Sequence, residues 1–119
     1  MEIGEQKNLA TFYIAIILYE ASSDAPDYTP LYQESFVLLQ AHSAEEARQK
    51  AFLHAQHEQI SYPNEYNEQI SWSFKQIIDV SPVLSETFND GSELYARHFR
   101  DYQAYRLFEP LLSGNISSA

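Results

Sequence analysis

The pattern of apolar and polar residues predicts a central β-strand near the start of the chain. Residues 11–20, "TFYIAIILYE", are rich in isoleucine and aromatic residues, which favour strands. Successive side chains of a strand point to opposite faces of the sheet, and here both sets are apolar. One face would carry Phe12, Ile14, Ile16 and Leu18, and the other would carry Tyr13, Ala15, Ile17 and Tyr19. A strand that is apolar on both faces is typical of a sheet centre with both sides covered.

Two further long segments have the pattern of strands. Residues 32–41, "YQESFVLLQA", follow a loop at 21–31 that is long for a hairpin, since hairpin loops usually have about two to five residues. Residues 69–80, "QISWSFKQIIDV", repeat apolar side chains at alternate positions, and Gln76 interrupts the row, which indicates either a β-bulge or a buried amide. The row consists of Ile70, Trp72, Phe74, Ile78 and Val80. Residues 61–68 have room for one short extra strand that ends at a turn.

The clearest helix signal begins at Ser43. Ser43 stands at the N-cap position and Glu46 follows three residues later, an arrangement in which both side chains pair with free backbone N–H groups at the helix start. The helix carries a narrow stripe of mostly small residues, which would let it lie close against a sheet. The stripe consists of Ala44, Ala47, Ala51 and Ala55, with Phe52.

Residues 93–112, "ELYARHFRDYQAYRLFEPLL", predict a second helical region. Ser92 would cap its start, and Pro110 would close it because proline cannot continue a helix. Side chains of alternating charge step by four along it, as on a solvent-exposed helix face. They are Glu93, Arg97 and Asp101.

This order of elements predicts an α+β fold: a small, mostly antiparallel sheet of three or four strands, one packed helix and a C-terminal helical region. The strands at 32–41 and 69–80 are joined through the helix, so we expect them to run parallel, with the first strand between or beside them in the opposite direction. By length the chain is one domain. It would comprise a loose leader at 1–10, a folded core at 11–112 and a flexible tail at 113–119.

Charge and composition narrow the functional classes. Seventeen Asp and Glu against seven Lys and Arg give a net charge of -10, and an acidic surface repels phosphate backbones and anionic lipids. We therefore expect binding to neither nucleic acid nor membranes. The longest strongly apolar run, residues 12–19, is far shorter than the roughly 20 residues of a membrane helix. The polar N-terminus lacks the apolar core of an export signal, and the chain has no cysteine, so we expect a cytoplasmic protein.

Signals for metal binding or catalysis are weak. His54 and His57 lie three residues apart beside Glu58, and two imidazoles on one helix face can share a metal ion. However, no distant third ligand is evident, and the helix dipole alone favours histidines near a helix C-terminus. We therefore predict no metal site and no cofactor. The three glycines form no phosphate-binding loop, and no spacing indicates a catalytic residue.

The C-terminal region contains an unusual combination of cationic and aromatic side chains. The candidate ligand-binding residues are Arg97, His98, Arg100 and Tyr102. An arginine stacked on an aromatic ring is often structural, but a guanidinium also holds carboxylate or phosphate groups. The structural interpretation is favoured, because charged stripes on helices usually face solvent. An anionic-ligand site stays an open alternative.

Five segments occur in a recognisable order: "FYIAIILYE", "QESFVLLQA", "SAEEARQKA", "ISWSF" and "DGSELYARHF". Together they resemble the bacterial family called domain of unknown function 4288 over roughly residues 11–100. The resemblance implies a small cytosolic bacterial domain. It implies no activity, cofactor or catalytic residue. The stretch after Arg100 is an extension outside it.

We expect a protein–protein interaction or assembly role, with a homodimer as a plausible form. The second apolar face of the first strand needs a cover, which either the C-terminal helix or a second copy of the chain would supply. Tyr-, Phe- and Arg-rich surfaces are the kind that carry interface energy. The expected interface residues are Tyr28, Tyr32, Tyr95, Phe99, Tyr102 and Tyr105. The alternative is a small anionic-ligand-binding domain or an enzyme that uses the cluster around Arg100.

Overall fold

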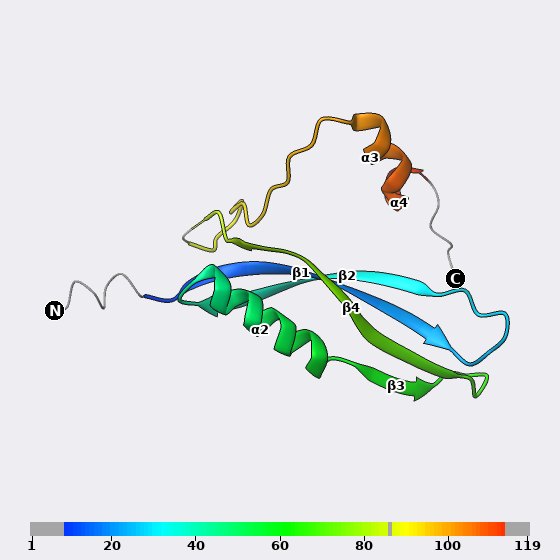
Figure 1. Cartoon of the computed structure of the whole chain (residues 1–119). Coiled ribbons are helices and arrows are strands. Elements are labelled where there is room, and N and C mark those ends of the chain that lie inside the picture. Colours follow the sequence, from blue (N-terminus) through cyan, green and yellow to red (C-terminus); the bar gives the residue numbers. More distant parts are fainter. Residues whose placement is uncertain (1–8, 86, 114–119) are drawn as a thin grey trace.

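A curled antiparallel sheet with one packed helix forms the body of the molecule, and two short helices follow in the C-terminal segment (Figure 1). This computed structural model describes residues 9–85 and 87–113, so most of the predicted leader at 1–10 and tail at 113–119 lies outside the described residues. The α+β prediction is confirmed. The strands are β1 Thr11–Ser23, β2 Leu31–Ala41, β3 Ile60–Pro63 and β4 Gln69–Pro82, and the helices are α2 Ala44–His57, α3 Tyr102–Phe108 and α4 Pro110–Ser113.

The strand β1 lies inside the sheet, as its two apolar faces predict. The strand order is β2-β1-β4-β3 and each neighbouring pair is antiparallel. Ile16 of β1, for example, lies between Phe36 of β2 and Asp79 of β4. Because β2 and β4 both run opposite to β1, they run parallel to each other, as predicted. The short extra strand anticipated before residue 68 is β3.

Helix α2 covers one face of the sheet. The Ser43 hydroxyl accepts a hydrogen bond from the Glu46 N–H at 3.1 Å, and the Glu46 carboxylate accepts one from the His42 N–H at 2.5 Å. Three alanines of the predicted stripe are fully buried and let α2 lie close to β1. They are Ala47, Ala51 and Ala55. Ala44 and Phe52 are exposed, which corrects the wider stripe predicted from the sequence.

The strand β4 contains two register shifts against β1. The partners step from Asp79 to Ile77 and from Gln76 to Phe74, so Ile78 and Lys75 are passed over. Each shift moves the following side chains to the other face. The bulge interpretation of Gln76 is therefore correct, and its side chain is exposed rather than buried. The predicted face is wrong at one position, because Ile77 and not Ile78 packs against the core beneath α2.

The segment after β4 differs most from the prediction. Residues 93–101 form no helix, so the expected row of alternating charges does not share a helix face. Ser92 does not cap a helix but closes a turn, where its hydroxyl accepts a hydrogen bond from the Asn89 N–H at 2.9 Å. Gly91 supplies the positive φ of +89° in this turn. Helix α3 begins later, with Asp101 as its N-cap, and a second short helix starts at Pro110.

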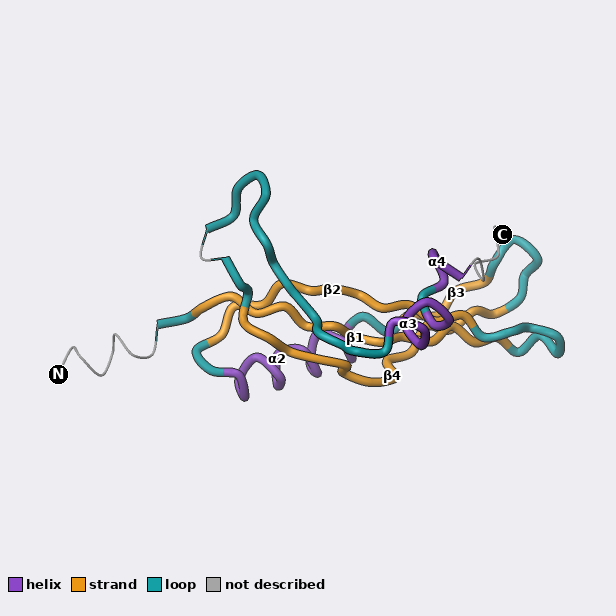
Figure 2. Tube along the Cα trace, turned by 90° about the horizontal axis from the view of Figure 1, so that it is seen from above, coloured by secondary structure: helices purple, strands orange, loops and turns teal. Residues whose placement is uncertain are grey.

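The chain is extended for its length. The Cα radius of gyration is 18.3 Å, whereas a compact domain of this size has about 13–14 Å. We call residues 83–95 the connector and residues 96–113 the C-terminal arm. The connector crosses the sheet (Figure 2), and the C-terminal arm stands away from the body of the molecule (Figure 1). No helix in the described part of the chain is long and apolar enough to cross a membrane.

A groove on the open face of the sheet

The sheet face opposite α2, called here the open face, is formed by the second set of side chains of β1 and their neighbours. The strand register places Phe36 and Leu38 of β2 beside Ile16 and Ile14 of β1 on this face. Ile14 and Ile16 are buried, whereas the exposed fraction of the Phe36 side chain is 60%. An inner strand thus carries a buried apolar row whose neighbours on β2 remain open to solvent.

The open face is apolar at one end and polar at the other. At the polar end, the Glu20 carboxylate lies 3.3 Å from the Lys75 ammonium group and accepts a hydrogen bond from the Tyr32 hydroxyl at 3.3 Å. Glu34 is exposed at the same end. The apolar end lies where β1 begins and β2 ends. This division matters because only at the apolar end is burial of the surface away from water favourable.

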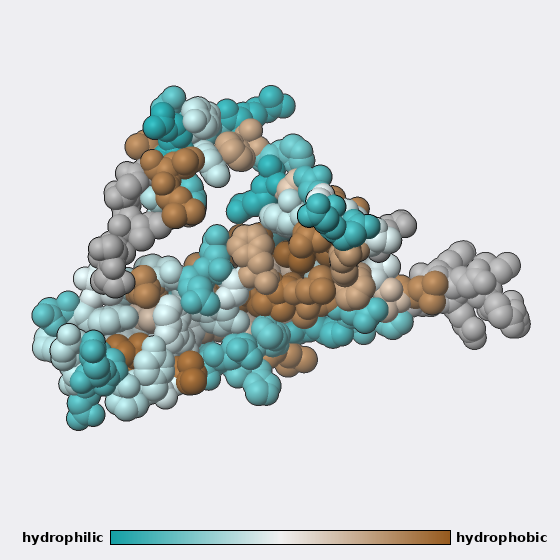
Figure 3. Space-filling model, turned by 180° about the vertical axis from the view of Figure 1, so that it is seen from behind, coloured by the Kyte–Doolittle hydropathy of each residue, from teal (hydrophilic) through white to brown (hydrophobic). Residues whose placement is uncertain are grey.

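The connector crosses the apolar end and leaves a groove of about 500 Å³ beside it. The Phe88 ring packs on Phe12 with a centroid distance of 5.2 Å, and the Tyr95 ring meets Phe36 edge-on at 6.3 Å. Figure 3 shows apolar side chains gathered below the connector and an opening between the body and the C-terminal arm. The groove is lined by Ile14, Phe36, Leu38, Phe88, Asn89, Ser92, Leu94 and Tyr95.

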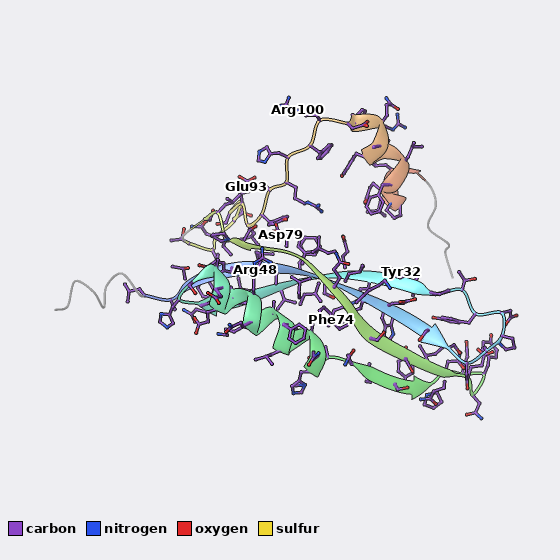
Figure 4. The ribbon with its side chains drawn as sticks, in the orientation of Figure 1. Tyr32, Arg48, Phe74, Asp79, Glu93 and Arg100 are labelled. Atoms are coloured by element: carbon purple, nitrogen blue, oxygen red, sulfur yellow. The ribbon has the colours of Figure 1, made fainter. Side chains whose placement is uncertain are left out.

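A hydrogen bond between Tyr95 and Asp79 ties the connector to the sheet. The Tyr95 hydroxyl donates to the Asp79 carboxylate at 2.5 Å, and the Ser81 hydroxyl donates to it at 2.9 Å. The bond from Tyr95 is the main reason that the pKa of Asp79 lies below its usual range. Burial and then the Asp79 carboxylate raise the pKa of Tyr95. Asp79 points toward the connector in Figure 4, so this bond holds one wall of the groove in place.

The predicted ligand-binding residues do not line the groove. Arg97, His98 and Arg100 are exposed along the irregular start of the C-terminal arm, and Tyr102 begins α3. Figure 4 shows Arg100 far from the sheet. The Arg106 guanidinium lies 6.0 Å from the centre of the Tyr102 ring. In this arrangement the four predicted side chains follow one another along the arm and do not converge on one point.

The predicted interface residues are divided between four parts of the molecule. Tyr95 lines the groove, Tyr32 lies at the polar end of the open face, and Tyr28 is half-buried in the loop before β2. On the C-terminal arm, the ring of Phe99 stacks on that of Tyr105 at 4.6 Å. The residues that sequence reasoning missed are Phe36, Leu38, Phe88 and Leu94. The run "FVLL" in β2, apolar on both faces, could have indicated the first two.

The two histidines considered as metal ligands lie on α2. His54 is half-buried and lines a second cavity of about 270 Å³, and His57 is exposed. Burial and the nearby Glu58 carboxylate raise the pKa of Tyr19 in that cavity. Within residues 9–85 and 87–113, no group of three or more histidine, aspartate or glutamate side chains is arranged to hold a metal ion.

Comparisons with known proteins give one finding. No curated protein and no solved structure matches the chain. A family model described as "Domain of unknown function (DUF4288)" matches residues 12–96. The match covers the sheet, α2 and the connector, and stops where the C-terminal arm begins. The chain therefore belongs to the DUF4288 family, as its sequence segments indicate.

Proposed function

We propose that the chain is a protein–protein interaction domain that associates with a second copy of itself through the groove on the open face. The observation that carries this proposal is the uncovered apolar end of the sheet beside the connector. Contiguous exposed apolar surface of this kind is typical of interaction sites. Full burial of an exposed large apolar side chain contributes about 1.5–3 kcal/mol. Phe36 and Leu38 are 60% and 48% exposed, so covering each of them would contribute about half of that range.

A second copy fits this surface because the chain carries two uncovered apolar surfaces. One is the groove, and the other is the C-terminal arm, where Leu107, Phe108 and Leu111 are all exposed. In a two-fold dimer both copies present the same surfaces, so one dimer would cover the groove and the apolar side of the C-terminal arm together. The C-terminal helix was one of the two expected covers for the second apolar face of β1. It does not cover this face within one chain, because α3 packs only against α4 among the described elements.

Charge reversal in the groove tests the proposal. We expect the purified wild-type chain to sediment as a dimer, with twice the mass of 13.7 kDa, and the Phe36→Glu variant to sediment as a folded monomer. A carboxylate at this position would have to be buried unpaired in the dimer, which is costly. The matched control is Leu53→Glu, because Leu53 is 65% exposed, close to the value for Phe36, but lies on α2, which packs on the other face.

The readout is sedimentation velocity, with circular dichroism as the check on folding and native mass spectrometry as the check on retained small molecules. A wild-type chain that is monomeric throughout the micromolar range would contradict the proposal. So would a Phe36→Glu variant that keeps the wild-type mass. A monomer that carries extra mass would instead support the ligand-binding alternative, and the identity of that mass would name the ligand.

A further inference from the structure

We propose that the segment which fills the groove is the C-terminal arm of the second copy, so that two chains exchange their arms reciprocally. This inference rests on the proposed self-association and adds which parts of the two copies meet. It concerns a segment beyond the family match, which ends at residue 96. The residues that would enter the partner's groove are Leu107, Phe108, Leu111 and Leu112.

The first support is that the arm has apolar side chains and few contacts in its own chain. Leu107, Phe108 and Leu111 are exposed to 75%, 74% and 79%, and among the large apolar side chains of the described chain only Tyr66, at 75%, is as exposed. A free helix as short as α3 is marginal in water, because helix nucleation is costly without packing. Another surface that buries this apolar side would therefore stabilise the arm as well as the groove.

The second support is the position of the arm over its own sheet. Figures 1 and 2 both place α3 above the half of the sheet where β2 begins, and Figure 4 shows Tyr32 there. This is the polar end of the open face, with the Glu20–Lys75 ion pair. Closing onto it would bury charges beneath apolar side chains, which is unfavourable. The arm and its own groove are thus offset from each other.

The third support is the link between groove and arm. The connector lines the groove up to Tyr95, and residues 96–101, "ARHFRD", then lead to α3 without regular structure. This link contains neither glycine nor proline, the residues that most favour a sharp reversal. Six extended residues span up to about 20 Å. The link therefore suits an arm that continues outward to a neighbouring chain better than one that turns back on itself.

The fourth support is charge. Residues 96–113 carry three arginines against Asp101 and Glu109, whereas residues 1–95 carry fifteen acidic and four cationic side chains. Two acidic bodies repel each other, but an arm with a slight positive charge is attracted to the body of another copy. Within the described chain, Arg97 and Arg100 form no salt bridge. Exposed Glu34 on the partner's open face is a suitable counter-charge.

Engineered cysteines test the exchange directly, because the chain has none of its own. Leu38→Cys in the groove and Leu111→Cys in the arm are made as separate single variants and mixed under mild oxidation. We expect disulfide-linked pairs of one chain of each kind, resolved by mass after tryptic digestion. The control mixture replaces the groove cysteine by Leu53→Cys on α2 and should yield at least tenfold less of the mixed product.

A second variant separates this inference from the proposed function. Phe108→Glu/Leu111→Glu should convert the dimer to a monomer if the arm is required. If this variant stays dimeric and the cysteine mixture gives no mixed product, the exchange is wrong while self-association stands. A Leu38→Cys/Leu111→Cys double variant that closes within one chain at high dilution would also overturn the exchange. A monomeric wild-type chain would remove both proposals.

Discussion

The hydrogen bond from Tyr95 to Asp79 connects two residues whose relation is invisible in the sequence. The sequence marks Tyr95 as one of several aromatic side chains in a predicted helix, and Asp79 as a polar side chain of a strand. The structure joins them at 2.5 Å because the connector leaves β4 and recrosses the open face. A prediction from periodicity treats each element separately, so it cannot find a bond between a strand and an irregular segment.

Removing the Tyr95 hydroxyl should lower stability in a pH-dependent way. The pKa of Asp79 is lowered in the folded chain, mainly by Tyr95, so the stabilisation is present above the ordinary aspartate pKa of about 4 and is lost as the pH falls through the lowered value. We expect Tyr95→Phe to reduce the free energy of unfolding by about 1 kcal/mol at pH 7, and by less at pH 2.

Urea unfolding followed by circular dichroism at both pH values measures this difference. Tyr32→Phe is the matched control, because the Tyr32 hydroxyl also donates to a carboxylate but at the exposed surface, where such bonds contribute little. A loss for Tyr95→Phe that is the same at pH 7 and pH 2 would show that the bond does not depend on the ionised Asp79.

At the scale of elements, a helix or strand is predicted correctly where its own residues specify it, and incorrectly where contacts with distant residues decide its structure. Helix α2 is specified by its own residues: Ser43 and Glu46 fix its start, and the buried alanines fix its packed side. The strand β1 is likewise recognised from its own pattern. The helix expected from residue 93 does not form, because Leu94 and Tyr95 cover the sheet instead and the Leu94 carbonyl accepts a hydrogen bond from Leu84. Tertiary contacts thus override a local helical pattern.

The close approach of α2 to the sheet can be tested at Ala51. This side chain is fully buried against the core, so Ala51→Leu would force the helix away from β1. Overpacking of this kind costs about 1–3 kcal/mol. Ala44→Leu is the control, since Ala44 lies on the same helix but is exposed, and it should leave the free energy of unfolding within about 0.5 kcal/mol of wild type. Equal urea midpoints for both variants would refute the close packing.

At the scale of the whole molecule, the sequence indicates the chemistry of the proposed binding surface but not its position. It predicts that the second apolar face of β1 needs a cover, from the C-terminal helix or from a second copy, and that the aromatic C-terminal segment is a contact surface. It does not predict that the connector divides the open face. Nor does it predict that the candidate ligand-binding residues, Arg97 to Tyr102, lie one after another along the C-terminal arm. Both depend on where the chain goes after β4. The turn residues Asn89 to Gly91 indicate a local reversal, but they do not indicate the path of the chain across the sheet.

Arm exchange predicts that trypsin cleavage after Arg97, Arg100 and Arg106 depends on protein concentration. These sites lie on the C-terminal arm and are exposed in a single chain. Dilution should free the arm and speed its cleavage several-fold, whereas cleavage after Arg48 on α2 should keep the same rate. The measurement is mass spectrometry of a time course at several protein concentrations. Arm cleavage that is independent of concentration would argue against exchange.

The strand order also gives the sheet two unequal edges. On one side, β3 has four residues and ends in Pro63, which lacks the N–H that a further strand would need. On the other side, β2 has eleven residues with Glu34 as its single charge, and it contains the uncharged run "SFVLLQ". An edge strand of this composition is a template for aggregation. As acid neutralises the carboxylates and weakens repulsion between chains, the strand that forms the groove wall becomes the place where fibrous aggregates would start.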